Sequence, residues 1–206
     1  MPGTGRAPRS VRAWVGAARG FAAIGACALS LCCALAASDV PSLKSDAREA
    51  FEEGRPTDAL RTLRTAIALA PDDADAHYLL GVIALRSDRI GEAETALARA
   101  AVLAPRDART LAAWGLALRA QRRWEEAESA LVRSLLLNPG DPSAIVALGE
   151  LYRLSGQPEK CATRYEQFVW QLEQIEPSQL DPQQQRALNV ARDRASECAA
   201  AASAER

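Results

Sequence analysis

The sequence is poor in the residues and motifs from which enzymes build active sites. His77 is its only histidine, and one imidazole cannot supply a cluster of metal ligands. The chain has no Cys-x-x-Cys pair, no glycine-rich phosphate loop and no Gly-x-Ser-x-Gly nucleophile motif. Two glutamate pairs, Glu52-Glu53 and Glu125-Glu126, lie beside predicted turns on amphipathic helices, where a solvated surface is the ordinary explanation. Because no nucleophile–base pair is visible, the sequence predicts no catalytic residue, no metal site and no cofactor.

Clustered positive charge is also absent from most of the chain. Four of the 25 basic residues precede Asp39, the first acidic residue. The remainder has 21 basic against 26 acidic residues, a net charge of −5. Phosphate binding needs a clustered positive surface, so the composition argues against nucleic acid as a partner. Arginine outnumbers lysine by 23 to two, which we interpret as a bias in base composition.

The N-terminal segment, residues 1–38, contains no acidic side chain and has the layout of an export signal. Four arginines precede an uncharged run, residues 20–37, which ends in small residues of the kind that a signal peptidase requires. We expect a cleaved signal peptide. Two alternatives stay open: an N-terminal membrane anchor formed by residues 20–37, and a lipoprotein attached at Cys27. In each case the rest of the chain is exported, to the periplasm or the outer face of the cytoplasmic membrane.

Cysteine is scarce beyond this segment. Three of the five cysteines lie within residues 1–38, which leaves only Cys161 and Cys198 in the mature protein. Two thiols in an oxidising compartment suggest a single disulfide bond.

The abundant feature is a tandem repeat of constant period. Similar stretches begin at Leu69, Leu103 and Leu137, which are equally spaced. Four further columns keep the same step: Ala59, Ala93 and Ala127; Leu63, Leu97 and Leu131; Pro71, Pro105 and Pro139; and Gly81, Gly115 and Gly149. Five columns in one register indicate an array of similar structural units.

Each period has the pattern of two helices joined by a turn. In the second period, apolar residues recur at steps of three or four on both sides of residues 87–89, and Pro105 ends the second helix. Gly81 and Ala93 stand where the two helix backbones approach closely, so that a larger side chain would push them apart. An Asp or Asn near each proline helps to start the next helix.

These residues give the sequence a resemblance to the tetratricopeptide repeat family, whose unit is a helix–turn–helix of the same period. The resemblance implies an all-α fold, a right-handed α-solenoid of about four repeats near residues 40–73, 74–107, 108–141 and 142–175, within a domain of residues 41–175. The first repeat departs from the pattern, because Ala47 stands where glycine is expected. The matching residues are Leu80-Gly81, Ala93, Leu97, Ala100 and Pro105; Trp114-Gly115, Ala127, Leu131 and Pro139; and Leu148-Gly149 with Tyr152.

The fourth repeat departs in a way that predicts how the array ends. No proline stands at residue 173, and the next is Pro177, so we expect the last repeat helix to run an extra turn. Pro182 then begins a capping helix, residues 182–200, whose polar outer face would cover the open end of the stack. Residues 201–206 are expected to form a disordered tail.

The two mature cysteines lie on these last two helices. Cys161 replaces the alanine of earlier repeats early in the last repeat helix, and Cys198 lies late in the capping helix. Since helices of the implied stack alternate in direction, the two residues are expected to meet and form a disulfide. The alternative is that Cys161 only fills a small core position.

The resemblance also implies a function, because the first helices of such repeats line a concave groove that holds a peptide or helix of a partner protein. Leu79 and Ala113 replace polar members of the clamp with which some family members read a terminal carboxylate, so we do not expect that recognition. Some of the groove positions could instead pack between repeats. The predicted groove residues are Lys44, Arg48, Phe51, Asp75, Tyr78, Val82, Leu85, Arg109, Ala112, Leu116, Arg119, Ser143, Val146, Glu150 and Arg153.

We therefore expect a non-enzymatic scaffold or adaptor that binds a protein of the bacterial cell envelope. Two alternatives stay open. One is an accessory subunit or an enzyme whose activity the motifs do not reveal. The other is a self-associating oligomer in which the last helix of one protomer occupies the groove of another.

Overall fold

The computed structural model describes residues 39–176 and 178–204, and within these residues all regular structure is helical. The predicted all-α repeat fold is confirmed. The predicted leader, residues 1–38, lies outside the described residues. No helix in the described part of the chain combines the length and hydropathy that a bilayer crossing requires. The helices are α2 (Val40–Glu52), α3 (Pro56–Leu69), α4 (Ala74–Arg86), α5 (Ile90–Leu103), α6 (Ala108–Ala120), α7 (Trp124–Leu137), α8 (Pro142–Leu154), α9 (Pro158–Glu173) and α10 (Pro182–Ala204).

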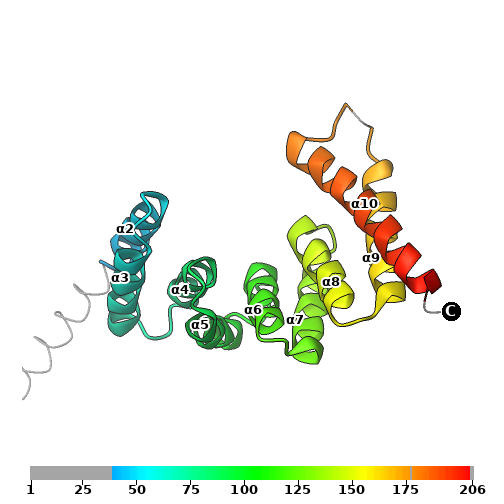
Figure 1. The fold of residues 1–206 in the computed structure, drawn as a ribbon. Helices are drawn as coiled ribbons and strands as arrows, with labels where there is room; N and C mark the ends of the chain where they lie inside the picture. The colour runs from blue at the N-terminus through cyan, green and yellow to red at the C-terminus, as the bar shows by residue number, and fades with distance from the viewer. Residues whose placement is uncertain (1–38, 177, 205–206) are drawn as a thin grey trace, which may run out of the picture.

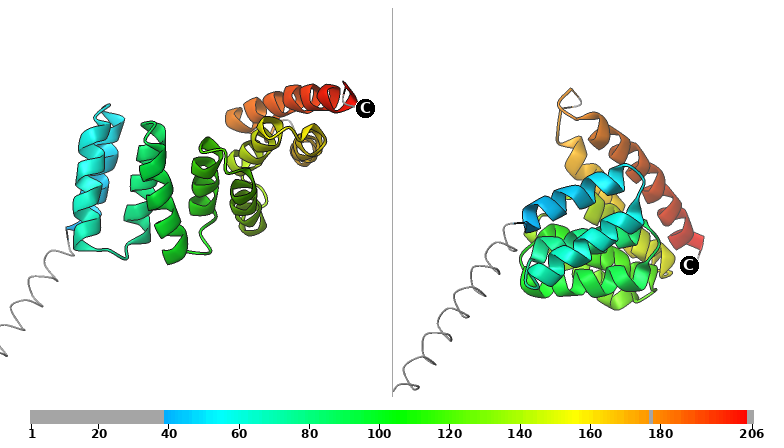
Figure 2. Two further views of the ribbon diagram at one scale, coloured as in Figure 1. Left: turned by 60° about the horizontal axis from the view of Figure 1, so that its bottom comes forward. Right: turned by 90° about the vertical axis from the view of Figure 1, so that its left-hand side faces the viewer.

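The helices stack in consecutive pairs to form a curved solenoid (Figure 1). The pairs α2–α3, α4–α5, α6–α7 and α8–α9 are the four repeats, and α10 packs against α9 and α8. Figure 2 shows α10 lying across the end of the stack. The first helices of successive repeats contact one another, whereas in the described chain the second helices make no close backbone contact. The first helices therefore lie on the inner side of the curve.

Aspartate side chains start the first helices of the second, third and fourth repeats. Oδ1 of Asp73 accepts a hydrogen bond from the backbone N–H of Ala76 at 3.0 Å. Asp107 and Asp141 cap α6 and α8 in the same way. Each cap satisfies a backbone donor that the first helical turn leaves without a partner. The predicted role of the acidic residue near each proline is thus found in the structure.

The turn within each repeat needs one residue in the left-handed backbone region. Gly54 and Gly156 supply it in the first and fourth repeats, with φ of 77° and 70°. Asp88 and Arg122 occupy the same position in the second and third repeats, with φ of 58° and 59°. Aspartate tolerates this conformation better than most residues, whereas an arginine there is uncommon.

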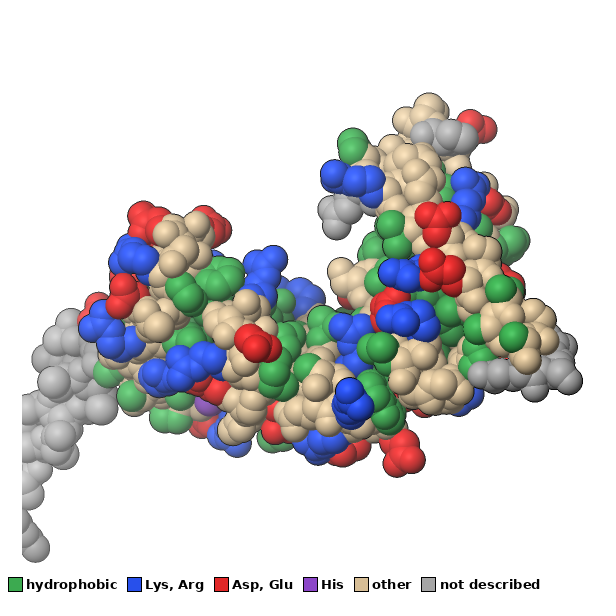
Figure 3. All heavy atoms as spheres, in the orientation of Figure 1, with side chains coloured by type: hydrophobic (Ala, Val, Ile, Leu, Met, Phe, Trp, Pro, Cys, Tyr) green, Lys and Arg blue, Asp and Glu red, His purple; other side chains and the backbone are tan. Residues whose placement is uncertain are grey.

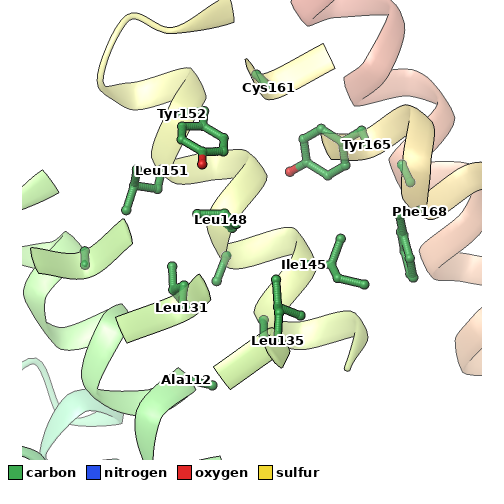
Figure 4. Close-up of a cluster of buried hydrophobic side chains, with 14 of the residues drawn as sticks. Ala112, Leu131, Leu135, Ile145, Leu148, Leu151, Tyr152, Cys161, Tyr165 and Phe168 are labelled. Atoms are coloured by element: carbon green, nitrogen blue, oxygen red, sulfur yellow. The ribbon is translucent and has the colours of Figure 1, made fainter. Parts of the chain in front are cut away.

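Small residues let the two helices of a repeat approach. Ala59, Ala93, Ala127 and Cys161 occupy equivalent positions and are completely buried. A Cβ atom added at Gly149 would lie 2.5 Å from Cζ of Tyr165, so the tyrosine ring fills the space that glycine leaves. Figure 4 shows Tyr165 among the buried side chains of the third and fourth repeats.

The C-terminal end differs from the prediction in two respects. Helix α9 has 16 residues against 14 in α3, so it is longer by about half a turn and not by a full turn. Helix α10 runs to Ala204, so the predicted disordered tail is wrong for residues 201–204; residues 205–206 lie outside the described chain. Ala202 is buried, and an alanine-rich sequence favours the helix.

A disulfide joins Cys161 to Cys198 and ties α10 to the beginning of α9. Their Cα atoms are 5.8 Å apart, and both side chains are buried. The antiparallel packing of α9 and α10 brings the two residues together, as expected from the alternation of helices. The structure therefore favours the disulfide over the alternative in which Cys161 is only a small core residue.

Candidate interaction surface

The inner side of the solenoid forms a hollow between the α2 end and the α10 end of the molecule (Figure 3). Hydrophobic and basic side chains both reach the surface along its floor. We use the name concave surface for the predicted groove residues on the inner helices α2, α4, α6 and α8. These residues come from helices that contact one another in succession on the inner side of the curve.

The middle of the concave surface is apolar and half-buried. Tyr78, Val82 and Leu85 on α4 pack partly against the core of the first two repeats, while Leu116 and Val146 pack against the core of the last two. Each of them keeps part of its side chain accessible. Half-buried apolar side chains of this kind can contact a partner while they stay packed against the core.

Ala112 is the predicted groove residue that does not reach the surface. It is only 7% exposed and belongs to the core formed by α6, α7 and α8, close to Leu135 in Figure 4. A methyl side chain is too short to extend past its larger neighbours. Ala112 is therefore a packing residue between repeats, the alternative left open above.

Arginine side chains cover the aromatic residues of the concave surface. The guanidinium of Arg109 lies 5.4 Å from the ring centre of Tyr78, and that of Arg86 lies 5.7 Å from the ring centre of Phe51. Arg109 also pairs with Asp107 at 3.2 Å and with Asp75 at 3.8 Å. Its hydrogen bond to Asp107 raises the pKa of Arg109 further. With its side chain 67% exposed, Arg109 remains accessible to a partner.

In the first repeat the charge of Lys44 is paired with a carboxylate. Its Nζ lies 2.8 Å from Oδ2 of Asp73, the residue that caps α4. Burial by itself would raise the pKa of Asp73, but the hydrogen bonds from Lys44 and Ala76 outweigh it, and the pKa is lowered. Both side chains are largely shielded from solvent. Lys44 therefore joins two repeats, and it is poorly placed to bind a partner.

In the fourth repeat the charges are also paired, in part with α10. Glu150 accepts hydrogen bonds from Arg153 at 2.8 Å and from the Tyr165 hydroxyl at 3.4 Å. Arg194 of α10 lies 3.3 Å from the same carboxylate. Burial alone would raise the pKa of Glu150, but Arg153 and Arg194 lower it. Arg194 is not among the predicted groove residues, because the angle at which α10 crosses α8 has no signal in the local sequence.

The charges of the concave surface that have no ion-pair partner in the described part of the chain are positive. Its acidic residues are Asp75 and Glu150, and its basic residues are Lys44, Arg48, Arg109, Arg119 and Arg153. Among the residues that the structure describes, Arg48 and Arg119 form no ion pair. The surface therefore suits a partner with apolar side chains and excess negative charge.

A separate crevice lies on the outer side, between α3 and α5. It has a volume of about 740 Å³, and Ile67, Leu80 and His77 form part of its lining. The Nε2 atom of His77 is 2.9 Å from the carbonyl oxygen of Pro71, so the only histidine is engaged in holding the turn before α4. In the described chain no three His, Cys, Asp or Glu side chains are grouped so that they could hold a metal ion.

Comparison with known proteins shows where this fold recurs. The family model described as tetratricopeptide repeat matches residues 46–108 and 112–160. No match to curated proteins was found by sequence.

Three solved structures illustrate the likeness. A crystal structure of MamA has a TM-score of 0.62 at 24% identity, covering 66% of this chain and 80% of that chain. The O-GlcNAc transferase of Thermobaculum terrenum has a TM-score of 0.62 at 26% identity, covering 66% of this chain but 27% of the transferase. The first TPR of Spaghetti, bound to the HSP90 peptide SRMEEVD, has a TM-score of 0.56 at 19% identity and covers 58% of this chain and 95% of that chain.

Proposed function

This chain belongs to the tetratricopeptide repeat family, and we propose that it is a scaffold that binds a segment of a partner protein on the concave surface. The observation that carries the proposal is the half-buried apolar strip of Tyr78, Val82, Leu85 and Leu116 between accessible arginines. A partner segment with apolar and acidic side chains would bury the strip and neutralise the surface. In the Spaghetti structure a peptide is bound to a domain of this fold, which supports the proposal by analogy.

The proposed place of action is the bacterial cell envelope. Its support is the pattern of residues 1–38: arginines, an uncharged run and a small-residue end. Alkaline phosphatase fused to the C-terminus gives a direct test, because the enzyme is active only after export. Active fusions in intact cells support the envelope; inactive fusions with normal protein levels contradict it.

Charge substitutions on the concave surface test the binding proposal. Tyr78→Glu and Leu116→Glu place an anion in the apolar strip and should weaken capture of an acidic partner by at least about tenfold, since each removes a central contact and adds repulsion. Photo-crosslinking from these two positions in the native host identifies the partner. The amount of partner that the wild type captures is then the reference for the variants.

Matched controls are available on the outer side. Val102 of α5 and Leu136 of α7 are 70% and 76% exposed, so glutamate at either position changes charge and hydrophobicity without touching the concave surface. These variants should capture the partner like the wild type. If they lose the partner while Tyr78→Glu retains it, the concave surface is not the binding site. Sedimentation at several protein concentrations shows whether the captured partner is a second copy of the chain.

A further inference from the structure

A cleft of about 330 Å³ opens at the rim of the concave surface, where α6 and α8 end. Its lining consists of Arg119 and Ala120 at the end of α6, Arg122 in the following turn, Trp124 at the start of α7, and Leu154 at the end of α8. Arg119 belongs to the predicted groove, and Leu154 follows Arg153, which also does. The cleft therefore shares Arg119 with the surface proposed above to bind a partner.

The cleft carries two positive charges and no negative one. Neither Arg119 nor Arg122 forms an ion pair within the described residues. Arg123, next in the chain, shows the contrast: it lies 2.6 Å from Glu126 and 3.3 Å from Glu94. Two guanidinium groups without an ion-pair partner make the cleft attractive to an anion.

Apolar surface adjoins these two charges. Leu154 is 50% exposed although it is a large aliphatic side chain, and the Trp124 side chain is half-buried. The residues equivalent to Leu154 in the earlier repeats are Glu52, Arg86 and Ala120, so the exposed leucine is peculiar to this cleft. A ligand that fits must present an apolar group beside its anion.

The backbone conformation of Arg122 also indicates that its side chain has a role in binding. The residue takes a left-handed conformation, with φ of 59°, at a position where the first and fourth repeats have glycine. A side chain other than glycine loses stability there, so the arginine has a cost that its folded contacts do not explain. Use of its side chain by a ligand would explain it.

We propose that this cleft anchors an acidic side chain of the partner, together with the leucine-like or aromatic side chain next to it. Arg119 and Arg122 bind the carboxylate, and Trp124 and Leu154 bury the apolar neighbour. A protein segment fits better than a free anion, because Trp124 and the exposed Leu154 line the cleft beside the two arginines. The proposal rests on the proposed function, since it names the chemistry that the concave surface selects.

Two matched peptides test the proposal with the full mature chain. The first is a short amphipathic helix of leucine and glutamate; the second has glutamine at each glutamate position. Calorimetry at low salt should show about tenfold tighter binding of the glutamate peptide by the wild type, as a charge-assisted contact provides. Arg119→Gln/Arg122→Gln should remove this preference. Arg133→Gln, on the outer side of α7, should leave it unchanged.

Arg122→Gly separates binding from folding. Glycine is the residue that the first and fourth repeats use at this turn, so the variant should have an equal or higher Tm and yet bind the glutamate peptide more weakly. Equal binding of both peptides by the wild type would contradict the proposal that the cleft anchors an acidic side chain. An unchanged preference in the double variant would contradict it as well. If Tyr78→Glu still binds the glutamate peptide as the wild type does, the concave surface is not the binding site, and the proposed function fails separately from the cleft.

Discussion

A methyl group added at Gly115 would test how closely the two helices of a repeat are packed. A Cβ atom there would lie 2.7 Å from Cγ and 3.0 Å from Cδ2 of Leu131, and 3.3 Å from the carbonyl oxygen of Ala127. Leu131 is completely buried, and the carbonyl belongs to the backbone of α7. Neither can yield without displacing other core residues, so the helices must separate slightly.

The expected cost follows from two opposing effects. Overpacking of a core costs roughly 1–3 kcal/mol, while replacing a helical glycine by alanine returns up to about 1 kcal/mol. After a return of about 1 kcal/mol, Gly115→Ala should lower the free energy of unfolding by up to about 2 kcal/mol. Gly91→Ala is the matched control, because nothing lies within 4 Å of its added Cβ. It should raise the free energy of unfolding by a few tenths to about 1 kcal/mol.

Urea unfolding followed by circular dichroism measures both variants, and a double-mutant cycle isolates the contact. In the Leu131→Ala background the clash partner is missing, so Gly115→Ala should cost much less than in the wild type. If Gly115→Ala is as stable as Gly91→Ala, or costs the same in both backgrounds, then the close approach does not set the stability of the repeat.

Three further perturbations follow from the structure. Replacing both Cys161 and Cys198 by alanine should lower the free energy of unfolding by up to about 4 kcal/mol, the chain-entropy value for a closed loop of 37 residues, and unfolding with and without reductant measures it. Asp141→Ala should cost about 1 kcal/mol in thermal unfolding because α8 loses its cap, whereas Asp141→Asn, which can still accept the bond, should cost less. Burial would raise the pKa of Asp107, but hydrogen bonds from Arg109 and Thr110 lower it. The ionised Asp107 therefore stabilises the fold above the unfolded pKa of about 4, and this stabilisation is lost as the pH falls through the lower folded pKa. Asp107→Asn should make the free energy of unfolding depend less on pH in the acid range, and an unchanged dependence would contradict this.

The repeat, its helices and the pairing of its cysteines could all be predicted from the amino-acid sequence. These features depend on local signals: the regular register of glycine, alanine and leucine, the aspartate caps, and the order of helices along the chain. Alternating helices of a stack place Cys161 near Cys198 whatever the details of curvature. Helix propensity, capping and periodicity depend on residues that are close in sequence, so they can be recognised in a single sequence.

Which residues of the concave surface are available to a partner became clear only from the packed helices. Ala112 shares a groove register with Tyr78 and Val146 but is buried, and Glu150 is paired with Arg194 from a helix whose crossing angle no local pattern encodes. The packing of α6, α7 and α8 likewise places Arg119, Arg122 and Leu154 around one cleft. Exposure and charge pairing depend on how several helices pack on one another at once. They arise from contacts between residues that are distant in sequence, and these contacts form only in the assembled stack.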